Sequence, residues 1–363
     1  LFRMLRPERL VNPDAFFTVA QYMGALGAPQ SPYLPTSWIG SIFWSHLAGK
    51  DGGKGFEIAL TWFTAGTAVV ANVWLARLVY HTGVSKSQEA RGRLRGGARA
   101  LDILVRFVEK PFRRDVGAVI AKDIRVFFRD NTQWSQLLLL GALVVVYLYN
   151  FSVLPIEKSF VSLDFLQNTL AFLNMGLAAF VLSAVSARFV FTAVSGEGEG
   201  YLILRASPLN MKRYLWGKYL FFMVPLTVLA EILIVASNLL LGVAPFMMWL
   251  STITMAFLTA GIVALAVGLG AVYPDFRHQN IAQVATGFGG LIYMMVSALF
   301  TVMVIVIEAG PVYLLFRAGI AGFQLSAFQW VVVTACFAGC AAISVLAVIK
   351  PMQMGVKALE EYE

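Results

Sequence analysis

The stretch Ser195–Lys218, SGEGEGYLILRASPLNMKRYLWGK, decides how the chain folds. It lies between two apolar runs, each long enough to cross a bilayer, which takes about 20 helical residues. Its glycines permit a sharp change of direction where a membrane helix ends. Tyr201, Leu202 and Leu204 then supply a short apolar face, and Ser207 with Pro208 is typical of a helix start. The stretch predicts a turn, a short surface helix and a return into the membrane; an ordinary loop with well-placed caps is the alternative.

The composition of the whole chain indicates a membrane protein. Its 363 residues are 59% hydrophobic and 13% charged, whereas soluble domains carry about a quarter charged residues. The net charge of +8 comes from Lys and Arg between the apolar runs, a placement that fits an anionic membrane surface better than nucleic acid. We therefore expect an all-α polytopic protein of the cell inner (cytoplasmic) membrane that contacts the lipid bilayer and binds no nucleic acid.

Apolar runs of sufficient length predict about seven transmembrane helices. They lie at 57–80, 134–155, 165–193, 214–242, 246–273, 284–308 and 328–350. The fourth and fifth runs are divided by Gly242–Pro245, a sequence typical of a tight turn.

Basic residues orient these spans. Residues 81–133 hold twelve Lys and Arg, whereas the segments expected on the opposite side, 156–163, 243–245 and 309–327, hold one, none and one. Lys and Arg accumulate in cytoplasmic segments. The pattern therefore places 81–133, the loop 195–213 and the C-terminus in the cytoplasm, and 1–56 on the extracytoplasmic side.

The segment between the first two spans changes character along its length. Residues 81–115 have the composition of a basic cytoplasmic linker. Over 116–130 apolar residues recur at helical spacing and basic residues lie on another face. This pattern predicts an amphipathic helix on the inner leaflet, and an ordinary helical linker is the alternative. The residues expected at the membrane surface are Lys122, Arg125, Phe127, Phe128 and Arg129.

Polar side chains inside the spans mark a candidate translocation path. Glu231 lies in the middle of the fourth run, where an ionisable side chain is costly and functional by default. We expect it to face the bundle and to bond to Asn238, with Asn174 in the preceding span. The alternative is that these groups only form hydrogen bonds between helices. Glu308 is expected near the end of a span and is given no role.

The sequence offers no motif for catalysis. It has no Gly-x4-Gly-Lys-Ser/Thr phosphate loop, and its three histidines lack the spacing of metal ligands. Packing accounts for Cys336 and Cys340, since buried thiols commonly behave as small hydrophobes. We therefore predict no enzymatic activity, no cofactor and no metal site. The lack of paired histidines also disfavours a membrane-embedded enzyme or respiratory subunit.

The order of residues from Glu199 to Lys218 resembles the coupling loop of ABC-2 type permeases. An acid, a glycine, a Leu-rich turn, an arginine and a proline are followed by Gly-Lys at the foot of the next span. Residues 121–140, AKDIRVFFRDNTQWSQLLLL, are similar to the family's interfacial elbow helix. Residues 273–290, YPDFRHQNIAQVATGFGG, are similar to its link between the fourth and fifth core spans. The resemblance covers about 116–350.

This resemblance implies a six-span permease core over 116–363, with the elbow helix at 116–130, preceded by one extra span at 57–80. The short helix would rest in a cleft of a separate ATPase subunit that binds ATP, and the transporter would be an exporter. The residues it assigns to coupling are Glu197, Glu199, Gly200, Leu202, Leu204, Arg205 and Pro208.

The resemblance extends to a subgroup of large ABC permeases with two six-span halves. It implies an N-terminally truncated fragment that pairs with a missing N-terminal half or forms a homodimer. The alternative function is an ion-coupled secondary transporter, which needs several intramembrane carboxylates; the sequence analysis finds one central carboxylate, Glu231.

Overall fold

The computed structural model describes residues 35–47, 49, 55–89, 102–103, 105–108, 110, 113–129, 131–152, 163–277, 280–321 and 326–362. Every regular element within these ranges is a helix, which confirms the predicted all-α class. The chain divides into two compact units, Leu1–Ile103 and Leu104–Glu363.

The N-terminal unit contains α2 (Pro35–Leu47) and α3 (Gly55–Glu89), which contact each other. The part of α3 from Gly55 to Tyr80 is long and apolar enough to cross a membrane, as predicted for 57–80. The helix continues to Glu89, so the first residues assigned to the basic linker are helical instead. With 13 residues, α2 is too short to span a bilayer.

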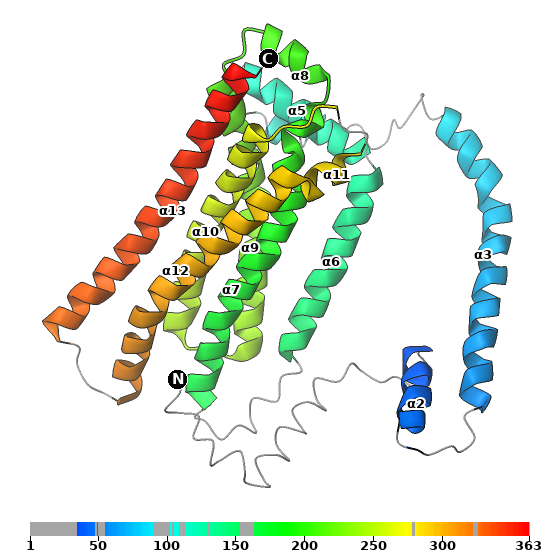
Figure 1. Ribbon diagram of the computed structural model, residues 1–363, viewed down its shortest axis with the longest axis horizontal. Helices are drawn as coiled ribbons and strands as arrows, with labels where there is room; N and C mark the ends of the chain where they lie inside the picture. The colour runs from blue at the N-terminus through cyan, green and yellow to red at the C-terminus, as the bar shows by residue number, and fades with distance from the viewer. Residues whose placement is uncertain are drawn as a thin grey trace. The chain divides into compact units, whose positions relative to one another are not determined.

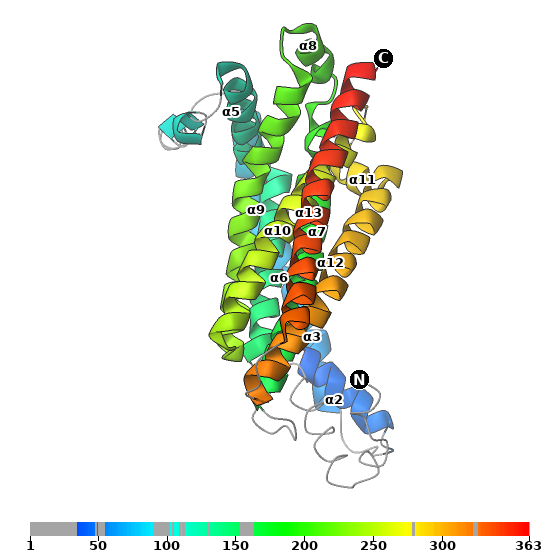
Figure 2. The ribbon, with the colours of Figure 1, turned by 90° about the vertical axis from the view of Figure 1, so that its left-hand side faces the viewer.

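The second unit is a bundle of long helices with short elements at one end (Figure 1). Its long helices are α5 (Arg114–Arg129), α6 (Asn131–Ser152), α7 (Leu163–Phe189), α9 (Met211–Leu241), α10 (Pro245–Val272), α12 (Phe288–Ala321) and α13 (Ala327–Glu361). The short ones are the 3-10 turns η3 (Phe191–Ala193) and η4 (Ser195–Glu197), and the helices α8 (Gly200–Ala206) and α11 (Ile281–Thr286). Figures 1 and 2 show α8 at the same end of the bundle as the C-terminus.

The predicted spans of this unit are confirmed as helices. Five of them, α7, α9, α10, α12 and α13, are each long and apolar enough to cross a membrane. The amphipathic α5 and the apolar α6 form a pair bent by 77°. Two spans are longer than predicted: α12 continues beyond 308 through Pro311 to Ala321, and α13 continues beyond 350 to Glu361. Proline is tolerated inside transmembrane helices because neighbouring groups satisfy the freed backbone.

The turn between α9 and α10 has the predicted form. Gly242 ends α9 with φ +66°, a left-handed conformation that favours glycine, and Pro245 opens α10. The predicted start of α9 at Ser207 and Pro208 is wrong. Ser207 instead ends α8, and its hydroxyl donates to the Leu204 carbonyl. An asparagine three residues further on, Asn210, caps α9 by accepting from the Arg213 N–H.

Helix α10 lies at the centre of the bundle, and its residues from Gly261 to Ala271 are all buried. Two glycines allow it to touch α13 backbone to backbone. A Cβ added at Gly268 would lie 2.4 Å from the Pro351 carbonyl oxygen, and one added at Gly355 would lie 2.8 Å from the Gly268 carbonyl oxygen. The helices α10 and α13 therefore cross closely near the end of the bundle that carries α8.

Candidate functional site

Helix α8 presents an exposed apolar surface outside the spans. Leu202 is 62% exposed and Ile203 76% exposed. Four other residues predicted for coupling are also exposed: Glu199, Gly200, Arg205 and Pro208. Leu204 is half-buried and packs against the bundle core. Ile203 was not among the residues predicted for coupling, although it lies among three consecutive apolar residues of a seven-residue helix.

The chain reverses between α7 and α8 through a compact turn. After η3 and η4, Gly198 adopts φ +53°, which only glycine adopts readily. Ser195, fully buried, accepts a hydrogen bond from the Asp275 N–H at 3.0 Å. The turn is therefore attached to the connection between α10 and α11.

Tyr201 anchors α8 to the end of the bundle. Its side chain is buried and stacks on Phe276 with ring centroids 4.3 Å apart and planes inclined by 7°. Its hydroxyl donates to the Leu359 carbonyl at 2.9 Å, and Tyr362 packs edge-on against both rings. One face of α8 is thus fixed to the last turn of α13, while Leu202 and Ile203 remain free of the bundle.

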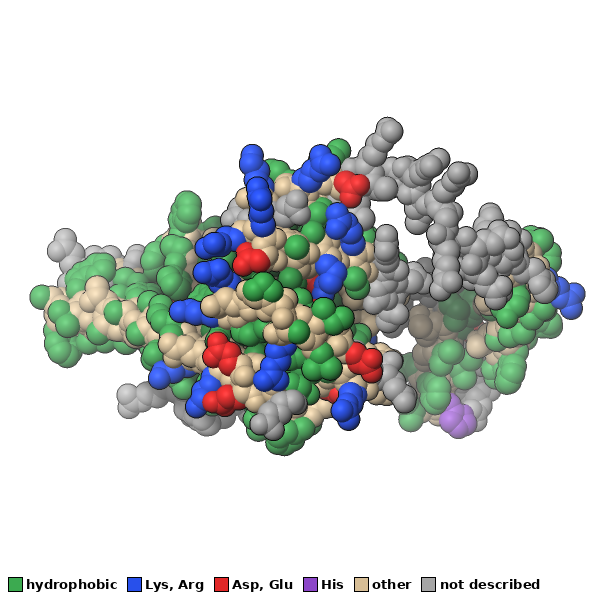
Figure 3. All heavy atoms as spheres, turned by 90° about the horizontal axis from the view of Figure 1, so that it is seen from above, with side chains coloured by type: hydrophobic (Ala, Val, Ile, Leu, Met, Phe, Trp, Pro, Cys, Tyr) green, Lys and Arg blue, Asp and Glu red, His purple; other side chains and the backbone are tan. Residues whose placement is uncertain are grey.

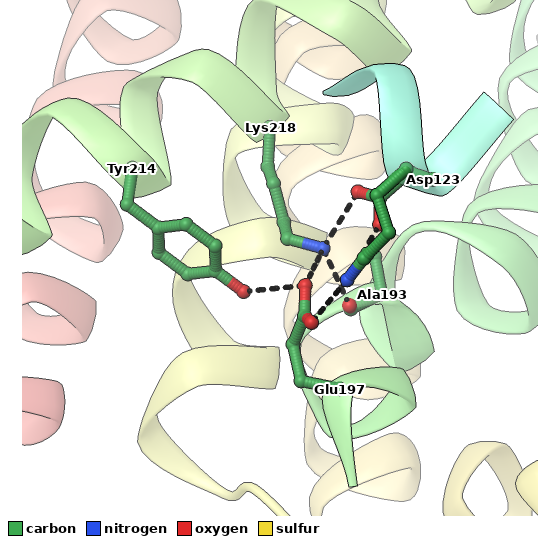
Figure 4. Close-up of polar contacts among 6 residues, drawn as sticks. Asp123, Ala193, Glu197, Tyr214 and Lys218 are labelled. Atoms are coloured by element: carbon green, nitrogen blue, oxygen red, sulfur yellow. Dashed lines mark hydrogen bonds and ion pairs between the residues drawn. The ribbon is translucent and has the colours of Figure 1, made fainter. Parts of the chain in front are cut away.

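An ion network centred on the buried side chains of Lys218 and Glu197 fixes the turn from the other side (Figure 4). Lys218, near the start of α9, lies 2.8 Å from Glu197 Oε1 and 2.9 Å from Asp123 Oδ2 of α5. It also donates to the Ala193 carbonyl at 3.0 Å. Lys122 of α5 donates to Glu197 Oε2 and lies 3.1 Å from Asp123 Oδ1. Two lysines and two carboxylates therefore join α5, the α7–α8 turn and α9.

Glu197 is held in its ionised form within this network. Burial by itself would raise the pKa of Glu197, but Lys218 and then Lys122 outweigh burial and hold its pKa below the ordinary value. The Tyr214 hydroxyl donates to Glu197 Oε1 at 3.2 Å. The Glu197 side chain is only 4% exposed. Of the two glutamates predicted for coupling, Glu197 faces inward, where it holds the turn in place, whereas Glu199 is exposed.

The predicted interfacial helix packs closely on α9. A Cβ added at Gly217 would lie 2.2 Å from Val116 Cγ1, so glycine at this position permits the contact. At the bend between α5 and α6, the Trp134 ring centroid lies 6.0 Å from that of Phe127 and 5.5 Å from that of Phe128. Arg125 is exposed. The Arg129 side chain lies outside the described residues.

The end of the bundle that carries α8 is rich in basic side chains (Figure 3). Figure 3 looks onto this end and shows Lys and Arg spread across it with a few acidic groups between them. Exposed basic residues of the elements at this end are Arg113, Arg114, Lys122, Arg125, Arg205, Lys212, Arg213, Arg277 and Lys357. This concentration is what the predicted cytoplasmic orientation of the end requires.

The side chains predicted for a translocation path mainly form hydrogen bonds between helices. Asn174 of α7 accepts from the Tyr147 hydroxyl of α6 and donates to Ser237 Oγ of α9 at 2.7 Å. Asn238 of α9 donates to Ser251 Oγ of α10 at 2.7 Å. The predicted bond from Glu231 to Asn238 is therefore wrong, because the Asn238 amide group is directed to α10. Glu231 Oε2 is buried without a hydrogen-bond partner among the described residues.

No group of three or more His, Cys, Asp or Glu side chains in the described part of the chain is arranged to hold a metal ion.

A family model described as "Putative ATP-binding cassette" matches residues 1–363. Comparisons with curated proteins and with solved structures found no match.

Proposed function

Because this chain belongs to the ATP-binding cassette family whose model covers all of its residues, we propose that it is the membrane-spanning permease subunit of an ABC transporter. It would export a substrate using ATP that a separate ATPase subunit binds and hydrolyses. The chain itself would have no enzymatic activity and no cofactor. Its several apolar helices and the lack of a phosphate loop in its sequence support this division of labour.

The observation that carries the proposal is the exposed apolar tip of α8, formed by Leu202 and Ile203, on a helix that is fixed to the bundle by Tyr201 and Glu197. Leu202 and Ile203 project at the end of the bundle that is rich in Lys and Arg, where exposed apolar side chains grouped among polar ones indicate a protein contact. We infer that this tip fits a cleft of the ATPase subunit. The exposed Glu199 and Arg205 would supply the polar rim of that contact.

The attachments of α8 explain how a push on its tip would reach the spans. The Glu197–Lys218 ion pair leads to α9, and the Tyr201 hydrogen bond to Leu359 leads to α13. The bond between Ser195 and Asp275 leads to the connection between α10 and α11. A displacement of α8 would therefore be transmitted to three spans, α9, α10 and α13. A coupling helix must transmit motion in this way.

The proposed orientation follows from the same end of the bundle. It faces the cytoplasm, with α5 on the inner leaflet and the C-terminus on the cytoplasmic side. The span in α3 would complete a first half of the transporter. The partner that forms the second half of the translocation path would be that N-terminal half or a second copy of the chain.

An ion-coupled secondary transporter is the second candidate, and one observation favours it. Two carboxylates, Glu231 and Glu308, each have a buried oxygen without a hydrogen-bond partner among the described residues. Glu308 lies well inside α12, not near its end as predicted. Intramembrane carboxylates of this kind occur in proton and ion pathways.

The proposed function is tested by purifying the full chain from its native membranes and quantifying the ATPase subunit that accompanies it. Replacing both Leu202→Ser and Ile203→Ser should lower ATPase recovery at least about tenfold, because anchor residues dominate such contacts. Met354→Ser is the matched control, since Met354 is an exposed apolar residue on α13 and not on α8. If no ATPase accompanies the unaltered chain, the ion-coupled candidate is favoured. Equal recovery with the double variant would exclude α8 as the docking element.

A further inference from the structure

A cavity of about 340 Å³ lies between α10, α12 and α13. It is lined by the first half of α10, the middle of α12 and the first half of α13. These parts lie away from α8, so the cavity is in the opposite half of the bundle. The side chains that decide its chemistry are Phe246, Trp249, Phe257, Phe337, Thr254 and Glu308.

Glu308 is the acidic group in the cavity wall, and it is only partly satisfied. Glu308 is only 3% exposed. Its Oε1 accepts a hydrogen bond from the Thr254 hydroxyl at 2.8 Å. Oε2 is buried and has no hydrogen-bond partner among the described residues. A carboxylate in a membrane interior is costly to keep charged unless it is paired, and an adjacent cation stabilises its charged form.

The other walls of the cavity are aromatic. Four rings line it, those of Phe246, Trp249, Phe257 and Phe337. Aromatic faces attract cations, and the attraction grows when water is excluded. Trp249 is 70% exposed on the outer face of α10, so this wall also faces out of the bundle. A ligand dissolved in the bilayer can therefore enter the cavity from the side.

We propose that this cavity binds hydrophobic cations, molecules with an apolar body and one positive charge. The charge would lie next to the Glu308 carboxyl group, and the apolar body would lie among the rings of α10 and α13. A neutral lipid chain would fill the volume but leave the carboxylate unpaired, and an anion would be repelled by it. The site is independent of the proposed contact with an ATPase, because α8 lies at the other end of the bundle and binding needs no ATP.

The test uses benzyltrimethylammonium, which is permanently charged, and neopentylbenzene, its neutral isostere. Equilibrium dialysis with the labelled cation compares nanodiscs that hold the full chain with empty nanodiscs. Saturable binding of the cation is expected, and neopentylbenzene should compete at least about tenfold more weakly. No saturable binding, or equal competition by the neutral isostere, would overturn the proposal.

Two variants and a matched control locate the site. Glu308→Gln keeps the acceptor for Thr254 and removes the charge, and it should weaken cation binding at least about tenfold. Phe337→Leu keeps an apolar wall and removes a ring, and it should weaken cation binding about threefold. Glu231→Gln alters the other intramembrane carboxylate, which does not line the cavity, and should leave the affinity within about twofold. Cation binding that is unchanged in Glu308→Gln, or weakened as much in Glu231→Gln, would place the cation elsewhere.

Discussion

The ammonium group of Lys218 lies 2.8 Å from Glu197 Oε1, and both side chains are less than 5% exposed. The pair connects the first turns of α9 to the turn that carries α8. A buried charge is tolerated only while it keeps its partners. The attachment of α8 therefore depends on this contact, and its loss can be measured as a loss of stability.

Replacing Lys218 by methionine should destabilise the protein strongly. The variant leaves Glu197 and Asp123 without the ammonium between them, and breaking one side of a buried ion pair costs about 3–5 kcal/mol. Thermal unfolding of the purified protein in detergent should show a clear fall in the midpoint. Adding Glu197→Gln to Lys218→Met should restore part of the loss, because it removes one orphaned charge. An unchanged midpoint in Lys218→Met would mean that the network does not support the fold.

The contribution of Glu197 should depend on pH in a defined direction. Lys218 and Lys122 outweigh the opposing effect of burial and lower its pKa from 4.5 in the folded protein. A carboxyl with a lowered folded pKa stabilises the protein fully above its unfolded pKa, and the stabilisation is lost as the pH falls through the folded value. Between about pH 5 and about pH 3 the unaltered protein should therefore lose more stability than Glu197→Gln. Parallel pH profiles of the two proteins would contradict the assignment.

Two glycines offer a matched test of the contact between α10 and α13. A methyl group at Gly268 would meet the Pro351 backbone at 2.4 Å, whereas nothing lies within 4 Å of one at Gly339 in α13. Gly268→Ala should destabilise the protein by about 1–3 kcal/mol, because the backbone of α13 at Pro351 cannot move aside. Gly339→Ala should be neutral or stabilising by up to about 1 kcal/mol, since alanine favours a helix over glycine. The measurement is the thermal unfolding midpoint of each variant under the same conditions. Equal midpoints would argue against the close crossing of α10 and α13.

The anchor at Tyr201 predicts a local effect on α8. Tyr201→Ala removes both the stack on Phe276 and the bond to Leu359, so amide exchange over 200–206 should rise. The central turns of α10 should keep their protection. Tyr201→Phe keeps the stack and loses one hydrogen bond, a change of about 1 kcal/mol, and should give an intermediate exchange rate. Exchange that rises equally throughout the bundle would point to general unfolding instead of a local anchor.

The long helices could be predicted from the sequence because their signal is local. Apolar length located each span, and Gly242 with Pro245 marked the turn between α9 and α10. Errors arose where two local signals compete. Ser207 and Asn210 are both good helix caps, and only the packing of α8 decides that Asn210 begins α9. The sixth span was predicted to end at 308, yet α12 continues through Pro311, because neighbouring helices make proline tolerable inside a membrane helix.

The ion network and the cavity could not be predicted because they join distant parts of the chain. Lys122 meets Glu197 across 75 positions, and Thr254 meets Glu308 across 54. Glu197 was expected among the residues that couple to a partner, but the fold directs its side chain inward to two lysines. The error in the end of α12 also placed Glu308 at a span end, and this hid the carboxylate of the cavity wall.

The close crossing of α10 and α13 has a mechanical consequence. Gly268 is near the end of α10 that adjoins α8, whereas Phe246 is at the far end, about 33 Å away along the helix at 1.5 Å per residue. If the backbone contact acts as a pivot, each degree of rotation of α10 moves Phe246 by about 0.6 Å. The short arm of this lever leads through Phe276, just beyond α10, to Tyr201 of α8, and the long arm borders the cavity. With such a pivot, a small displacement at the α8 end would widen or narrow the cavity at the other end.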